Sequence, residues 1–179
     1  MTKAVPSFRI RPMTEEEARA ICAWRYPPPY DRYRWPSWEA MRAEGREFAD
    51  PEIRRQQYAS VTDERGELLG YAQFFRLDRA VRIGLGLRPD CCGRGWGASF
   101  AGAIAREAAR RGQGAEVDLE VETWNVRAIR AYRKAGFETE DRYERQAAHG
   151  VVSVLCMVWK PPGDEPRAPN GIGEGTPSY

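Results

Sequence analysis

The sequence lacks the features of a membrane, secreted or metal-binding protein. No apolar run approaches the roughly 18 residues that a bilayer-spanning helix needs, and residues 1–11 contain no apolar stretch typical of a secretory signal. The single histidine, His149, and the four cysteines do not form a zinc-ligand spacing. We therefore expect a cytoplasmic protein with no membrane partner and no metal.

The sequence also has little net charge. Its 28 Lys and Arg residues are nearly balanced by 26 Asp and Glu residues, which leaves a formal charge of +2. Short basic clusters such as Arg110-Arg111 are typical of solvated helix ends rather than of a DNA-binding face, so no nucleic-acid partner is expected. At 179 residues the chain is long enough for one domain with a sizeable core.

Hydrophobic periodicity predicts one domain over residues 1–160. Alternating apolar residues predict strands at residues 8–11, 58–62, 68–75, 79–87, 117–122, 137–144 and 151–159, the last two joined by a turn at His149-Gly150. Helices are expected at residues 14–24, 38–45, 97–111 and 125–136. Short links between the early strands favour an antiparallel meander. Residues 161–179 are rich in Pro and Gly, which predicts a disordered tail.

A glycine-rich loop between a predicted strand and a predicted helix carries the main chemical signal. Gly93, Gly95 and Gly97 have no Cβ atoms, so their backbone N–H groups can approach an anion closely. The free donors and the dipole of the following helix N-terminus favour negative charge at the same place. Arg94 adds a charged donor suited to phosphate. The loop therefore predicts a phosphate or pyrophosphate site.

Three interpretations of this loop compete. A P-loop requires Lys and then Ser or Thr after the last glycine, whereas Ala98-Ser99 follow here, so that interpretation fails. Gly93, Gly95 and Ala98 match a dinucleotide-binding fingerprint, but that motif belongs on the first strand of an alternating βαβ array. The third interpretation is a glycine-rich turn with no ligand. The loop by itself leaves a ligand site and a plain turn equally open.

A second motif follows about thirty residues later, and two ordered motifs are far more specific than one. It has the form Asn125-x-x-Ala128 followed by Tyr132-x-x-x-Gly136-Phe137. Residues 81–137 closely resemble the GCN5-related N-acetyltransferase superfamily, which pairs this motif with a loop of the form Arg/Gln-x-x-Gly-x-Gly/Ala. Cys92 stands where the family usually has Arg or Gln, a departure for which Arg94 partly compensates. The resemblance implies acetyl-CoA as co-substrate and an amine as acceptor.

The resemblance also implies a fold and a cofactor site. The expected fold is an α/β arrangement with a mixed, mostly antiparallel, twisted sheet of six to seven strands and helices on both faces. The acetyl thioester should enter through a splay between the strands at residues 79–87 and 117–122. Backbone pairing with pantetheine, a pyrophosphate cradle and a cofactor-contacting amide are implied at Leu85, Gly86, Leu87, Gly93, Arg94, Gly95, Trp96, Gly97, Ala98 and Asn125.

Amine acylation requires a neutral amine, a stabilised oxyanion and a protonated leaving thiolate. An exposed amine is mostly protonated near neutral pH, so a base must take its proton. Glu120, on the strand face opposite Leu119, is the candidate base. The resemblance implies that Tyr132 protonates the thiolate. The alternatives are a solvated Glu120, a core Tyr132 and a purely capping Asn125.

The acceptor site is expected in the aromatic segment at residues 24–38. Aromatic faces attract cations, and a carboxylate can pair with an amine, which selects Trp24, Tyr30 and Asp31 as substrate-binding candidates. The same rings could instead pack a satellite core. The acceptor stays open among small amines, antibiotics, polyamines and protein N-termini, and the protein is expected to be a monomer or a homodimer.

One other mechanism and two other functions remain open on the sequence. Direct transfer in a ternary complex is expected, whereas a ping-pong route would need Cys91 or Cys92 as nucleophile. A non-catalytic coenzyme A-binding module would keep the glycine loop without a working base. A nicotinamide or flavin enzyme would use Gly93, Gly95 and Ala98.

Overall fold

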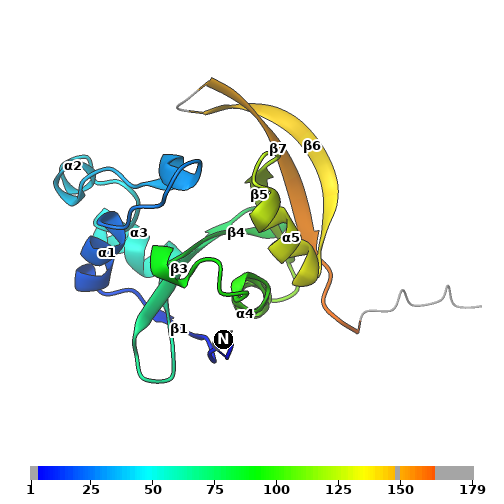
Figure 1. The fold of residues 1–179 in the computed structure, drawn as a ribbon, viewed down its shortest axis with the longest axis horizontal. Helices are drawn as coiled ribbons and strands as arrows, with labels where there is room; N and C mark the ends of the chain where they lie inside the picture. The colour runs from blue at the N-terminus through cyan, green and yellow to red at the C-terminus, as the bar shows by residue number, and fades with distance from the viewer. Residues whose placement is uncertain (1–3, 148–149, 164–179) are drawn as a thin grey trace, which may run out of the picture.

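The protein is built on a seven-stranded sheet with strand order β1-β2-β3-β4-β5-β7-β6, seen in a computed structural model that describes residues 4–147 and 150–163 (Figure 1). Its strands are β1 (Arg9–Pro12), β2 (Tyr58–Thr62), β3 (Leu68–Arg76), β4 (Ala80–Leu87), β5 (Glu116–Glu122), β6 (Phe137–Ala147) and β7 (Gly150–Trp159). Its α-helices are α1 (Glu15–Cys22), α2 (Trp38–Ala43), α3 (Pro51–Gln57), α4 (Gly97–Gly112) and α5 (Val126–Lys134). Short 3-10 helices occur at η1 (Tyr30–Tyr33), η2 (Glu47–Ala49) and η3 (Pro89–Cys91).

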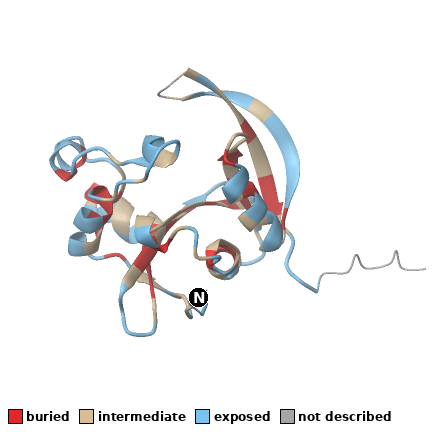
Figure 2. Ribbon diagram, in the orientation of Figure 1, coloured by how far each residue is buried: buried red, intermediate tan, exposed pale blue. Residues whose placement is uncertain are grey.

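The strand pairing confirms a mixed, mostly antiparallel sheet. Strands β1 to β4 form the expected antiparallel meander. Strands β4 and β5 are parallel, because α4 carries the chain back between them. Strand β7 then pairs antiparallel with both β5 and β6. Strand β6 is exposed over most of its length, whereas β7 is largely buried or half-buried (Figure 2).

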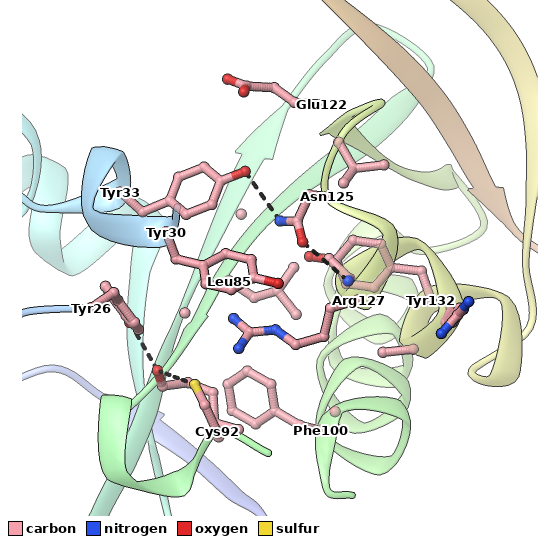
Figure 3. A pocket seen from close by; sticks show the side chains of 18 of the residues that line it. Tyr26, Tyr30, Tyr33, Leu85, Cys92, Phe100, Glu122, Asn125, Arg127 and Tyr132 are labelled. Atoms are coloured by element: carbon pink, nitrogen blue, oxygen red, sulfur yellow. Dashed lines mark hydrogen bonds between the residues drawn. The ribbon is translucent and has the colours of Figure 1, made fainter. Parts of the chain in front are cut away.

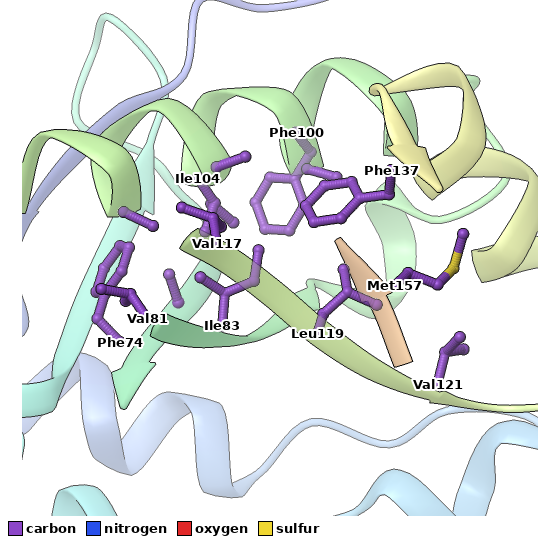
Figure 4. Packing of buried hydrophobic residues seen from close by; sticks show 14 of the residues in the cluster. Phe74, Val81, Ile83, Phe100, Ile104, Val117, Leu119, Val121, Phe137 and Met157 are labelled. Carbon is purple, nitrogen blue, oxygen red and sulfur yellow. The ribbon is translucent and has the colours of Figure 1, made fainter. Parts of the chain in front are cut away.

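Two hydrophobic cores lie on opposite faces of the sheet, which confirms the expectation of helices on both faces. The larger core packs inward-facing strand residues against the apolar face of α4 (Figure 4), with Val81, Ile83, Leu119, Val121, Phe100 and Ile104 among its members. The second core joins α1, α2 and η2 to Tyr58 on β2, with Tyr71 of β3 packed at its edge. Alternation along the strands therefore sends neighbouring residues to different cores.

Local capping signals account for several helix ends. Thr14 and Glu17 form the expected capping box at α1, and Gly136 follows α5 with a left-handed φ of +97°. Helix α3 was not predicted, although the sequence carried a signal for it. The Asp50 carboxylate caps the helix by accepting from the Glu52 and Ile53 N–H groups at 2.8 and 2.9 Å. Proline at position 51 suits the first turn.

Three expectations concern the chain ends and the last turn. Strand β6 runs to Ala147, three residues beyond the expected end at residue 144. The expected turn residue His149 lies outside the described residues, as does the expected disordered tail beyond Gly163. None of the described helices is both long and apolar enough to cross a bilayer.

Strands β4 and β5 separate part-way along their length, as expected. They pair at Ala80–Glu116, Val81–Val117 and Arg82–Asp118, but β4 continues to Leu87 and β5 continues to Glu122 without further pairing between them. Beyond that point β4 stays paired with β3, and β5 stays paired with β7. The sheet therefore opens between its two halves.

Candidate functional site

A cleft of about 930 Å³ occupies the opening between β4 and β5. Residues from β4 and the glycine-rich loop form one wall, and the end of β5 together with α5 forms the other (Figure 3). The segment of residues 26–35, here called the aromatic loop, supplies further lining residues. One cavity thus joins three segments that are far apart in the sequence.

The glycine-rich loop lines this cleft at Gly93 and Gly95. Gly93 and Gly95 have left-handed φ values of +76° and +80°, and a Cβ atom at either position would meet nothing within 4 Å. Backbone conformation, rather than crowding, therefore favours glycine at both positions. Among the residues that the structure describes, no side-chain hydrogen bond caps the N-terminus of α4, so the first N–H groups of this helix remain available to an anion.

The other predicted loop residues divide into two groups. Gly97, Trp96 and Ala98 line the cleft with Gly93 and Gly95. A Cβ atom on Gly97 would lie 3.1 Å from Cβ of Ala131, so glycine there lets α4 begin close against α5. Arg94 is not among the lining residues, and its guanidinium lies 5.1 Å from the ring centroid of Trp96.

Three cations on α5 face the same cleft, and the sequence analysis did not select them. Arg127, Arg130 and Lys134 recur at intervals of three and four residues, which places them on one side of the helix. That spacing was a usable signal in the sequence. Together with the donors of the glycine-rich loop, they make this part of the cleft favourable to phosphate groups.

Strand β4 turns an open backbone edge toward the cleft. The Leu87 carbonyl accepts a hydrogen bond from the Tyr26 hydroxyl at 2.8 Å, so it points away from β3. The N–H and C=O groups of every second strand residue point to the same edge. The backbone groups of Leu85 and Ile83 therefore also point away from β3. Because β5 has already separated there, this edge can pair with an extended ligand.

Tyr132 projects its hydroxyl from α5 into the cleft near Asn125 (Figure 3). Burial raises the pKa of Tyr132, so the phenol remains a proton donor over the whole neutral range. Asn125 is the N-cap of α5, as the capping interpretation required, because its Oδ1 accepts from the Ala128 N–H at 3.2 Å. Its amide nitrogen donates to the Tyr33 hydroxyl at 3.1 Å, which ties α5 to the aromatic loop.

Glu120 lines the cleft, but its carboxylate is already engaged. Arg82 and Arg145 form ion pairs with it, the latter at 3.1 Å, and the Tyr143 hydroxyl donates to it. Arg82 also binds Asp118 with two hydrogen bonds of 2.9 and 2.7 Å. Glu120 is thus neither solvated nor free, since its side chain is 19% exposed and is held by groups from β4 and β6.

Comparison with known proteins identifies the family. The sequence matches the family model for an acetyltransferase (GNAT) domain over residues 7–138. The chain belongs to the GNAT acetyltransferase family. As a member of this family it is an acyltransferase of the N-acetyltransferase type. A comparison with curated proteins finds no match.

Several solved structures share the GNAT fold. A chimera of the spermidine N-acetyltransferase SpeG from Vibrio cholerae and hSSAT has a TM-score of 0.70 and 15% identity, covering 85% of this chain and 94% of that chain. AAC(6')-Ib in complex with paromomycin and acetyl-CoA has a TM-score of 0.66 and 21% identity, covering 85% and 93%. A GNAT-family acetyltransferase from Bacillus anthracis has a TM-score of 0.66 and 11% identity, covering 87% and 95%. At such identities these structures show a common fold.

The topology of this GNAT domain argues against the dinucleotide interpretation of the glycine-rich loop. That fingerprint requires the first strand of a parallel βαβ array. Here the loop follows β4, the last strand of an antiparallel meander.

The aromatic loop packs on the turn that precedes α5. The ring centroids of Tyr30 and Tyr33 lie 5.7 and 5.8 Å from the ring centroid of Trp124. The Arg32 guanidinium lies 4.6 Å from the Trp124 ring and pairs with Glu122 at 3.3 Å. These contacts hold the aromatic loop against the β5 side of the cleft.

Only one of the three predicted acceptor residues lies in the cleft. Tyr30 lines it, and the Arg127 guanidinium is 3.7 Å from its ring centroid. Trp24 packs against the second core, 6.1 Å from the ring of Tyr71, as the satellite-core alternative required. Asp31 is exposed on η1, and neither it nor Trp24 is among the lining residues.

The two adjacent cysteines are in surroundings that suppress thiolate formation. Burial raises the pKa of both Cys91 and Cys92. Cys91 is buried in a small cluster with Leu69 and Trp96, whereas Cys92 lines the cleft and donates weakly to the Leu87 and Arg88 carbonyls. Both environments disfavour a covalent route through sulfur.

Proposed function

We propose that this protein transfers an acetyl group from acetyl-CoA to a primary amine by direct attack in a ternary complex. One observation carries the proposal: a single cleft brings together the donors at the α4 N-terminus, the open edge of β4 and the Tyr132 hydroxyl. The thioester of acetyl-CoA supplies the activated acyl group. The cleft residues supply binding, orientation and proton transfer.

The residues of the cleft suit the parts of coenzyme A. Backbone N–H groups of residues 93–98 would hold the diphosphate, and the cations of α5 would neutralise phosphate charge. The β4 edge at Leu85 and Leu87 would pair with the amide groups of pantetheine, and the backbone groups of Gly86 between them point to β3. A Cβ atom on Gly86 would lie 2.3 Å from the Tyr71 ring, so the packing of Tyr71 requires glycine at this position.

We assign the proton transfers to two side chains. Tyr132 donates its phenolic proton to the departing thiolate as the C–S bond breaks, and its raised pKa keeps the hydroxyl protonated at neutral pH until that transfer. The neutral amine attacks the thioester carbonyl, and Glu120 accepts the proton that the amine nitrogen releases as the C–N bond forms. Because Arg82, Arg145 and Tyr143 already occupy its carboxylate, we assign that transfer to a bridging water molecule.

The test is a thiol-release assay with acetyl-CoA over a panel of amines, with product masses measured. We expect amine-dependent release and initial-rate lines that intersect when both substrates are varied, as direct transfer requires. Parallel lines together with an acetylated cysteine would instead support the covalent route. Binding of acetyl-CoA without release by any amine would identify a non-catalytic module.

A further inference from the structure

The end of the cleft beneath the aromatic loop is here called the acceptor end. Its charged side chains limit which amines can bind there. Leu119 and Val121 face the larger core, so Glu120 and Glu122 face the opposite side of β5, toward the aromatic loop. These two are the only carboxylates among the residues that line the cleft within the described chain. An acceptor with several ammonium groups would need such carboxylates to be available.

Neither carboxylate is available. Arg32 pairs with Glu122 at 3.3 Å, and the Trp124 indole N–H donates to the same carboxylate. Arg82 and Arg145 pair with Glu120. A polycation would have to compete with these arginines for both carboxylates, and Arg82 is also held in place by two hydrogen bonds to Asp118.

Arg34 of the aromatic loop differs from these arginines, because it has no carboxylate partner among the described residues. It lines the cleft directly after η1, and it forms no ion pair with any of the residues that the structure describes. Arg32, two residues earlier in the chain, already forms an ion pair with Glu122. Arg34 is therefore a cation of the aromatic loop that lines the cleft without a balancing carboxylate among the described residues, and its guanidinium suits a planar carboxylate.

We propose that the acceptor is a primary amine that also carries a carboxylate, such as an amino acid or a short peptide with a free C-terminus, and that Arg34 binds this carboxylate. The inference rests on the proposed acetyl transfer and specifies its substrate class. Glu120 then takes the proton of the amine through the bridging water, and Arg34 binds the acid group of the same molecule.

The experiment compares matched acceptors, namely short peptides that end in a carboxylate and the same peptides that end in a carboxamide, with spermidine as the polycation. For the wild-type protein we expect kcat/KM to be at least about fivefold higher for the carboxylate, the factor that corresponds to about 1 kcal/mol at 25 °C. Arg34→Gln should remove this preference by raising KM for the carboxylate peptide, and Arg34→Lys should restore part of it. Arg65→Gln, in the exposed turn between β2 and β3, is the matched control and should keep the preference.

Four outcomes would overturn the inference. Equal kcat/KM for the two peptide forms, or faster acetylation of spermidine, would overturn it while acetyl transfer itself stood. Weaker acetyl-CoA binding by Arg34→Gln, measured by calorimetry, would reassign Arg34 to the cofactor. If no amine were acetylated by protein that binds acetyl-CoA, this inference and the proposed function would fall together.

Discussion

The two ends of the cleft are built in different ways. The end formed by the glycine-rich loop offers mainly backbone groups, at the α4 N-terminus and along the edge of β4. The end beneath the aromatic loop is lined by charged and aromatic side chains that are mostly paired with one another. A backbone surface can bind a ligand common to a whole family, whereas a side-chain surface can vary its specificity without changing the fold.

The largest expected effect lies where the two ends meet. Tyr132→Phe removes the hydroxyl that faces the cleft and keeps the ring that packs 6.0 Å from Phe137. We expect kcat to fall about 100-fold, the lower range for loss of a general acid, with the acetyl-CoA dissociation constant unchanged. Steady-state kinetics and calorimetry on the same preparation would measure both. A kcat within twofold of wild type would remove Tyr132 from the mechanism.

A smaller effect is expected from the paired carboxylate at the acceptor end. Glu120→Gln should lower kcat about tenfold, less than loss of an unpaired base, because the bridging water can still lose a proton to solvent. Glu138→Gln on exposed β6 is the matched control and should leave kcat unchanged. Thermal unfolding would check the fold, since the substitution weakens the ion pairs of Arg82 and Arg145. An unchanged kcat would return Glu120 to a structural role.

The backbone end gives the next effect. Gly95→Ala places a side chain at φ +80°, which strains the loop by about 1–2 kcal/mol. We expect the acetyl-CoA dissociation constant to rise about fivefold, the equivalent of about 1 kcal/mol. Gly114→Ala is the control, because Gly114 has φ +97° and open surroundings but does not line the cleft. Equal loss of stability in both variants with no change in binding would show that the loop conformation is irrelevant to the cofactor.

The same contrast explains what could be read from the sequence. The meander, the glycine-rich loop, the Asn125 cap and Tyr132 are encoded by residues close together in the chain, so pattern and family motif were sufficient to select them. The partners of Glu120 were not accessible in this way. Arg82 and Arg145 reach it from β4 and β6, and their placement depends on strand register and on a bulge in β6 near Asp141.

The positions of single residues in the aromatic segment could not be predicted for a related reason. Its composition indicated an acceptor wall, but composition cannot assign single rings to the cleft or to the second core. Trp24 packs against the second core, whereas Tyr30 lines the cleft. Trp124, on which Tyr30 and Tyr33 pack, lies about ninety residues further along the chain, and no local pattern connects the two segments.

The smallest expected effect concerns stability alone and tests whether α4 can be weakened away from the cleft. Arg110 and Arg111 hydrogen-bond to Glu107, and chiefly the Arg110 bond lowers the pKa of Glu107 to about 2. Because the folded-state pKa lies below the unfolded value, the stabilisation is complete above about pH 4.5 and is lost as the pH falls toward 2. Glu107→Gln should lower the unfolding free energy by about 1 kcal/mol at pH 7.

Urea unfolding of wild type and Glu107→Gln at several pH values would measure this difference. We expect it to shrink between pH 4.5 and the acid limit, with acetyl-CoA binding at pH 7 unchanged. A difference that grew on acidification would contradict the lowered pKa.

The most direct measurement is calorimetric titration of the purified protein with coenzyme A and, separately, with S-acetylpantetheine, which lacks the diphosphate. If the backbone donors at the α4 N-terminus hold the diphosphate, coenzyme A should bind at one site, and S-acetylpantetheine should bind at least about 100-fold more weakly, a difference of about 2.7 kcal/mol. Equal affinities, or no heat with saturating coenzyme A, would contradict that claim.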